Sequence, residues 1–241
     1  FRTGPAGTRS IVLVVVKTAE GASITKQIVI RPAAIDLVWQ TNSYTPPLYR
    51  GKALPSAGSR IRVAVAPPII GPGGVSLRAS DLTFTWKRNN KVLGALSGRG
   101  KSSVVIDGPS IADDLTASVV VASSDGRFSG EGVISLAMRD PEVLVYQNDP
   151  LLGVRFERAL ADLLTIGGQE TTFIAYPYFF TAVTHTDPNL AYRWTLGGAT
   201  AQSAPGDMGS MVIRPEKGAS GTTPVGISVE HRKQLLQTAG N

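Results

Sequence analysis

Two histidines, His185 and His231, offer the widest range of chemistry among the side chains of this 241-residue chain. An imidazole can act as a general base or bind a metal ion, but either role needs suitably spaced polar partners. Neither histidine has an aspartate or glutamate at the helical spacing that would complete a metal pair. We therefore interpret both as solvent-exposed side chains and predict no metal site.

Residues 94–102 resemble a phosphate-binding loop, because glycines precede the pair Lys101-Ser102. That motif has four residues between its glycines, whereas five separate Gly94 from Gly100. It must also open a helix, since the N-terminal amides of the helix bind the phosphate. The residues that follow, 103–106, read Ser-Val-Val-Ile and predict a strand. We reject nucleotide binding and predict no cofactor.

Other catalytic signals are weak. No Gly-x-Ser-x-Gly elbow accompanies a plausible histidine partner, and the absence of cysteine excludes disulfides, cysteine-ligated zinc and thiol catalysis. The pair Asp113-Asp114 could contribute to a calcium site with Asp107, but no dense Asp-x-Asp series accompanies it. We interpret these carboxylates as solvated loop residues. The sequence therefore predicts a protein without catalytic residues.

The elements that carry these residues recur with a period near 108. Trp86 and Trp194 lie 108 residues apart in similar contexts, Leu-Thr-Phe-Thr-Trp and Leu-Ala-Tyr-Arg-Trp. Three further segment pairs repeat at offsets between 105 and 110: 63–67 with 173–177, 103–106 with 210–213, and 14–21 with 119–126. A period near 100 matches one β-sandwich domain.

The composition favours an all-β fold. Val, Ile and Thr are plentiful, while 26 Gly and 16 Pro separate short runs. We predict tandem immunoglobulin-like β-sandwiches: C-terminal strands of a partial unit at 1–34, a sandwich at 35–140, and one at 141–241 that lacks its last strand. Expected strands are 10–17 and 24–31; 36–40, 59–66, 82–87, 91–96, 102–106, 116–123 and 128–138; and 143–147, 171–176, 190–196, 210–214 and 225–230. Short helical stretches are expected at 157–164 and 230–238.

Three groups of residues have expected packing roles. Trp86 and Trp194 occupy the position at which such sandwiches bury an aromatic side chain against the opposite sheet. Pro46 and Pro47 stiffen a linker near a domain junction, with ordinary loop packing as the alternative. A hydrophobic corner, formed by Tyr176, Tyr178, Phe179 and Phe180, is interpreted as core or interdomain packing, with a sugar- or partner-binding platform as the alternative.

Nearly the whole chain resembles one family of proteins, and three blocks of residues carry the resemblance. The blocks 37–40 with 43–55, 148–153 with 155–160, and 176–180 are similar to large surface proteins of ultrasmall, genome-reduced bacteria. These proteins resemble tandem immunoglobulin-like or PKD-like repeats. The resemblance implies export to the cell surface but supplies no catalytic residue. It also implies a leader and the rest of the first unit before Phe1, and a closing strand after Asn241.

These observations favour a non-enzymatic, modular cell-surface protein that acts as a stalk or adhesin-like spacer. One alternative is a subunit of an extracellular filament assembled by β-strand complementation, and a second is the accessory binding region of a larger secreted enzyme. The expected partners are other surface proteins, copies of the chain itself or polysaccharide. The net charge is +6, but the 24 basic residues are scattered along the sequence, so we predict no nucleic-acid partner. No apolar run approaches the roughly 20 residues needed to span a bilayer.

Overall fold

The computed structural model describes residues 10–18, 21–30, 32–109, 113–160, 166 and 170–240. The fold is all-β, as predicted, with several mainly antiparallel sheets. The described helices are three short 3-10 turns, η1 (Pro72–Gly74), η2 (Ala79–Asp81) and η3 (Gly94–Leu96).

The chain divides into two compact units that interleave in sequence. The N-unit comprises Phe1–Gln40, Arg62–Ile106 and Asp114–Leu136. The C-unit comprises Thr41–Ile61, Asp107–Asp113 and Ala137–Asn241. The chain therefore leaves the N-unit after Gln40, contributes a 41–61 segment to the C-unit, and returns at Arg62.

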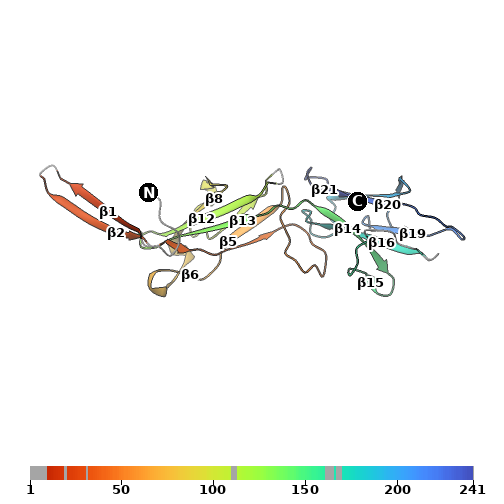
Figure 1. Cartoon of the computed structure of the whole chain (residues 1–241), viewed down its shortest axis with the longest axis horizontal. Helices are drawn as coiled ribbons and strands as arrows, with labels where there is room; N and C mark the ends of the chain where they lie inside the picture. The colour runs from red at the N-terminus through yellow and green to blue at the C-terminus, as the bar shows by residue number, and fades with distance from the viewer. Residues whose placement is uncertain are drawn as a thin grey trace. The chain divides into compact units, whose positions relative to one another are not determined.

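The N-unit is built on two main sheets (Figure 1). The larger has the order β10-β8-β12-β13-β3, with β9 also paired to β8, and the smaller has the order β11-β5-β4. A small pair, β6 (Ile69–Ile70) and β7 (Ser76–Leu77), accompanies them. The strands of the main sheets are β3 (Pro32–Ala34), β4 (Leu37–Thr41), β5 (Arg60–Val65), β8 (Leu82–Arg88), β9 (Lys91–Val92), β10 (Gly98–Arg99), β11 (Ser103–Asp107), β12 (Leu115–Ser123) and β13 (Ser129–Leu136).

Alternation along these strands forms the N-unit core. In β8, Leu82, Phe84 and Trp86 are buried, while Thr83 between them is exposed. Val104 and Ile106 of β11 show the same alternation. Because successive side chains of a strand point to opposite faces, this pattern gives each sheet one apolar face for the sandwich interior.

The C-unit contains two four-stranded sheets. One has the order β15-β14-β16-β19 and the other β18-β17-β20-β21. A buried apolar cluster draws on both, with Val143, Phe173, Trp194 and Ile227 among its members. The strands are β14 (Glu142–Asp149), β15 (Gly153–Val154), β16 (Thr171–Tyr178), β17 (Leu190–Leu196), β18 (Ala199–Ala201), β19 (Ser210–Ile213), β20 (Val225–His231) and β21 (Thr238–Gly240).

The two units repeat one strand pairing in the same register. In the N-unit, Trp86 of β8 pairs with Val119 of β12. In the C-unit, Trp194 of β17 pairs with Ile227 of β20, and both partners lie 108 positions further along the chain. The other sheets also correspond, since β11-β5-β4 and β19-β16-β14 follow the same order. The sequence period is therefore a period of paired strands.

Several local expectations were wrong. The last sandwich was expected to have no strand after β20, but a short strand, β21, pairs with β20 through Ser228–Gly240, Val229–Ala239 and Glu230–Thr238. The chain reverses after β20 through hydrogen bonds from His231 N–H to Gln237 O and from Gln237 N–H to Gln234 O, so 230–238 is not helical. Residues 157–160 are also not helical, and 161–164 lie outside the described residues.

One further element, the β1–β2 hairpin, is part of the N-unit. Strands β1 (Ser10–Lys17) and β2 (Ser23–Ile30) pair antiparallel over eight residues each. They form a separate two-stranded sheet, and no other described strand pairs with either of them.

Candidate functional site

The two repeat tryptophans lie inside their units. Trp86 is 0% exposed and Trp194 is 1% exposed. The indole N–H of Trp86 donates to the carbonyl of Lys101 at 2.8 Å, and that of Trp194 donates to the carbonyl of Met208 at 3.3 Å. Each indole thus fills the interior and satisfies a loop carbonyl from its own unit.

The aromatic corner of the C-unit is divided between two clusters. Phe180 joins the sandwich core, whereas Tyr176, Tyr178 and Phe179 belong to a second cluster together with Tyr146. The hydroxyl groups of Tyr146 and Tyr178 are 2.6 Å apart. Burial raises the pKa of Tyr178, and the hydrogen bond to Tyr146 raises it further. All four corner residues are buried, so the corner presents no open aromatic platform.

The 41–61 segment covers part of this second cluster. Tyr44 N–H donates to Phe180 O at 2.7 Å, and Phe179 N–H donates to Tyr44 O at 2.8 Å. Tyr44 and Leu54 are partly buried against the cluster. As a result, β16 is buried on both faces over Phe173–Tyr178 and shows no alternation of burial.

Pro46 and Pro47 form a turn within this segment of the C-unit rather than a linker between compact units. Tyr49 N–H donates to Pro46 O at 3.3 Å, and Leu48 has φ 65°. A positive φ after proline is the geometry of a type II turn. The turn places the ring of Tyr49 against Tyr178, with centroids 5.7 Å apart.

A buried glutamine, which the sequence analysis did not identify, joins three parts of the C-unit. Gln237 is 1% exposed. Its Oε1 accepts from Thr181 N–H at 2.8 Å, and its Nε2 lies within 3.0 Å of Ser56 Oγ, Ala57 O and Thr181 Oγ1. The hydroxyl of Ser56 in turn donates to Phe179 O at 2.7 Å. Gln237 therefore fixes the 41–61 segment and the end of β16 to the turn before β21.

A second polar cluster brings together His185, Asp207 and Ser210. The Oδ2 atom of Asp207 accepts from Ser210 Oγ at 2.7 Å and lies 3.7 Å from His185 Nε2. The carboxylate is therefore between the hydroxyl and the imidazole, whereas nucleophilic catalysis needs the imidazole beside the hydroxyl. Asp207 also accepts from Gly209 N–H at 2.9 Å, so its visible role is to hold the 207–210 turn.

The histidines are less exposed than predicted. His231 is buried, and its Nδ1 accepts a hydrogen bond from Lys233 N–H at 3.1 Å. The His185 ring contacts Tyr176, with centroids 4.9 Å apart. Asp113 and Asp114 are exposed, and no cluster of three or more His, Cys, Asp or Glu that could hold a metal occurs among the described residues.

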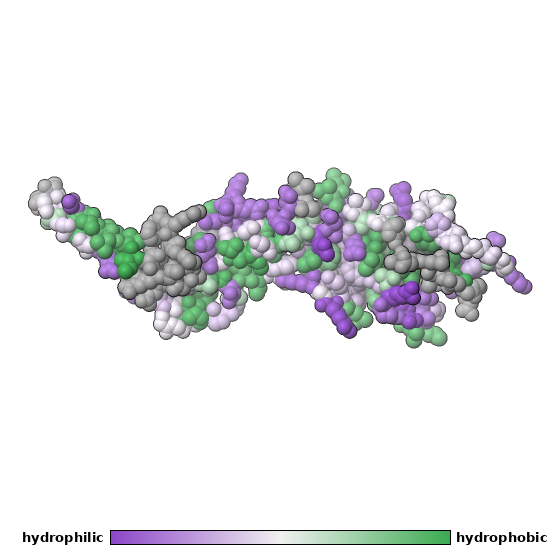
Figure 2. All heavy atoms as spheres, in the orientation of Figure 1, coloured by the Kyte–Doolittle hydropathy of each residue, from purple (hydrophilic) through white to green (hydrophobic). Residues whose placement is uncertain are grey.

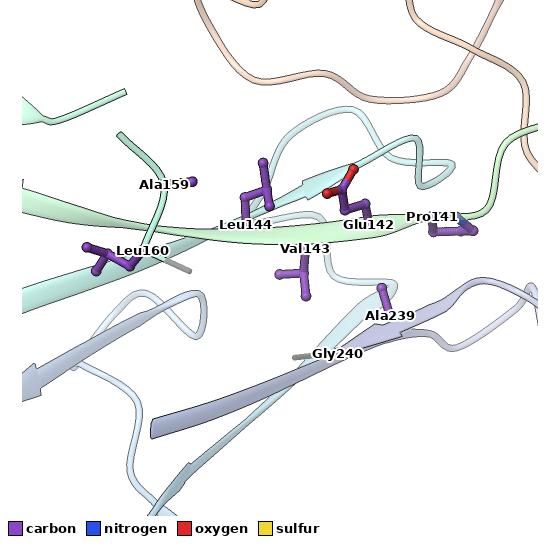
Figure 3. A pocket seen from close by; sticks show the side chains of 8 residues that line it. All are labelled: Pro141, Glu142, Val143, Leu144, Ala159, Leu160, Ala239 and Gly240. Atoms are coloured by element: carbon purple, nitrogen blue, oxygen red, sulfur yellow. The ribbon is translucent and has the colours of Figure 1, made fainter. Parts of the chain in front are cut away.

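A shallow groove of about 340 Å³ lies at the edge of the C-unit sandwich (Figure 3). Val143 points toward Ala239 and Gly240, while Leu144 and Glu142 point to the opposite side of β14. Glu142 is the charged residue of the lining, whose other members are Pro141, Ala159 and Leu160. Small-molecule sites usually place several convergent polar groups in an apolar pocket, and this lining supplies one carboxylate.

The β1–β2 hairpin carries a continuous run of exposed apolar side chains (Figure 2). Val14 and Val16 lie on one face, and Ile24 is paired opposite Val16. Exposed apolar residues on both faces have relative exposures between 40% and 62%: Ile11, Leu13, Val14, Val15, Val16, Ile24 and Ile28. A two-stranded hairpin is marginal by itself in water, so this surface is the strongest candidate for a contact with a partner.

Comparisons with known proteins supply no assignment: no protein-family model matches the chain, and no curated protein sequence matches it. Among the described residues, no helix is long and apolar enough to cross a bilayer.

Proposed function

We propose that this chain is a non-enzymatic structural module of a bacterial cell-surface protein, a stalk or adhesin-like spacer built of immunoglobulin-like repeats. The observation that carries the proposal is the repeated pairing of Trp86 with Val119 and Trp194 with Ile227. Tandem copies of one sandwich lengthen a protein without requiring a larger core, because each copy has its own core.

The polar side chains of the C-unit support the same proposal. Gln237, Ser210 and His231 are buried and hydrogen-bonded to groups of the protein itself. No buried side-chain nitrogen or oxygen among the described residues is without a hydrogen-bond partner. Networks that are satisfied in this way stabilise a single arrangement of the fold.

Single-molecule stretching of the full chain between handles at its two ends tests the mechanical role. We expect two separate unfolding events that recover when the force is released, one for each compact unit. The variant Trp194→Ala should weaken or remove one event and leave the other in place. Extension without any resisted event would contradict a spacer function.

The proposed location has its own test. Antibodies raised against the chain should label intact cells of the bacterium that produces it. Labelling only after the cells are permeabilised would contradict the surface location while leaving the mechanical measurement unaffected.

The exposed hairpin favours one alternative, a filament subunit assembled through β-strand complementation. An unpaired, apolar strand edge is a template for pairing with another chain. Light scattering behind a sizing column distinguishes the two functions. A spacer gives a mass near 25.3 kDa, whereas a filament subunit gives a ladder of multiples that persists on dilution.

A further inference from the structure

The β1–β2 hairpin has a counterpart in the same chain, the β12–β13 hairpin. Residues 14–21 read VVVKTAEG and residues 119–126 read VVVASSDG, 105 positions later. Both turns end in a glycine with positive φ, 85° at Gly21 and 70° at Gly126. The β12–β13 pair therefore shows what surrounds this type of hairpin when it is part of a sandwich.

In the N-unit, both edges of β12 are paired and its apolar face is buried. Ala117, Val119 and Val121 are 0% exposed, and the edge of β12 away from β13 pairs with β8. In that register Trp86 lies opposite Val119, and Phe84 lies opposite Val121. Strand β8, in which large apolar residues alternate, thus pairs with the edge of β12 that β13 does not occupy, and it contributes to the core beside β12.

The corresponding residues of β1 have none of these contacts within the described chain. The offset of 105 matches Val12, Val14 and Val16 to Ala117, Val119 and Val121. Val14 is 40% exposed and Val16 is 53% exposed. The residue types are those of a sandwich interior, although Val14 and Val16 are exposed to solvent and Val12 is half-buried.

We propose that the β1–β2 hairpin is a docking surface for an incomplete β-sandwich, one that lacks its last two strands. The incoming edge strand has the Leu-x-Phe-x-Trp pattern of β8 and pairs antiparallel with β1, so that its tryptophan lies opposite Val14. The hairpin completes the sandwich of its partner. This inference rests on the proposed function of the chain as one module of a β-sandwich assembly, and it names the partner class and the register.

One position shows how the partner differs from the N-unit. Lys26 pairs with Val14, whereas Gly132 pairs with Val119. A Cβ atom at Gly132 would lie 2.5 Å from Ile35 O, so the N-unit has no room for a side chain there. The partner must therefore leave space for the side chain of Lys26. The segment around Ile35 leaves no such space at Gly132, which is the corresponding position of the N-unit.

An extended chain tests the proposal. A copy of residues 35–109 is placed before residue 5, so that the added β8 and the natural β1 have the same spacing as β8 and β12. The extended chain is made in two forms, one with the natural Lys26 and one with Lys26→Gly. We expect a third unfolding event and exchange of the Leu13 and Val15 amides slowed about tenfold or more, most strongly in the Lys26→Gly form, because these amides point away from β2 and toward the free edge of β1. Val14→Lys should abolish this protection, whereas Val15→Lys, on the opposite face, should retain it.

Two results would overturn the proposal. The first is unchanged exchange of the β1 amides in both forms of the extended chain. The second is a dimer of the natural chain in which the β1 amides are protected and which Val14→Lys dissociates, because the occupant would then be a second copy. In either case the two unfolding events of the natural chain would remain, so failure of this inference is separable from failure of the spacer function.

Discussion

The side-chain amide nitrogen of Gln237 lies 3.0 Å from the hydroxyl oxygen of Ser56, although 181 positions separate the two residues. Both belong to the C-unit, to which Ser56 is contributed by the 41–61 segment. This contact fixes a segment that precedes most of the N-unit strands to a turn near the end of the chain. The contact therefore joins distant parts of the C-unit without a disulfide.

Replacing Gln237 by alanine should lower the free energy of unfolding of the C-unit by about 2–3 kcal/mol, because buried donors and acceptors lose their partner. Urea unfolding of the full chain measures the change. The control is Gln202→Ala, since Gln202 is exposed, and it should change stability by no more than about 0.5 kcal/mol. Equal effects of the two variants would show that Gln237 does not stabilise the unit.

Gly132→Ala should destabilise the N-unit by about 1–3 kcal/mol. A Cβ there meets the carbonyl oxygen of Ile35 at 2.5 Å, so β13 must move away from the adjoining backbone. Gly94→Ala is the matched control, because no atom lies within 4 Å of its added Cβ. Thermal unfolding should show a lower transition for the first variant only, and an unchanged transition for Gly132→Ala would refute the close approach.

The indole hydrogen bond predicts different costs for the two tryptophans. Trp86→Phe and Trp194→Phe remove similar volumes from similar cores, but the Trp86 bond is shorter, 2.8 Å against 3.3 Å. Trp86→Phe should therefore cost about 1 kcal/mol more, since the carbonyl of Lys101 loses the better donor. Denaturant unfolding of both variants checks the order, which the opposite ranking would contradict.

Alkaline pH should destabilise the C-unit through its tyrosines. Burial, together with the nearby Tyr176, raises the pKa of Tyr44 to about 12, above the unfolded value near 10. Between these values the unfolded chain loses the proton while the folded chain retains it, so this contribution is fully present below about pH 10 and is lost as the pH rises through about 12.

The measurement is the urea midpoint from pH 9 to 12, with tyrosinate absorbance followed in parallel. Tyr44→Phe should reduce the fall in stability over this range, because phenylalanine does not ionise. A wild-type curve that coincides with that of the variant would show that Tyr44 does not contribute.

Local sequence patterns predicted a large part of the fold. The alternation of Leu82, Phe84 and Trp86 indicates a strand with one buried face, and its return at Leu190–Trp194 predicts the second copy. Other features depend on distant partners. The short strand β21 exists because the chain turns back onto β20, and its three residues carry too little pattern to be predicted.

The sequence by itself determined the repeat, the all-β class and the buried positions of Trp86 and Trp194, because strand periodicity is written in neighbouring residues. The tertiary structure alone decided that Thr41–Ile61 packs in the C-unit, that β16 is buried on both faces, and that Gln237 meets Ser56. It also placed His185 beside Asp207. These relationships join residues far apart in the chain, so they depend on packing and hydrogen bonding that no local spacing encodes.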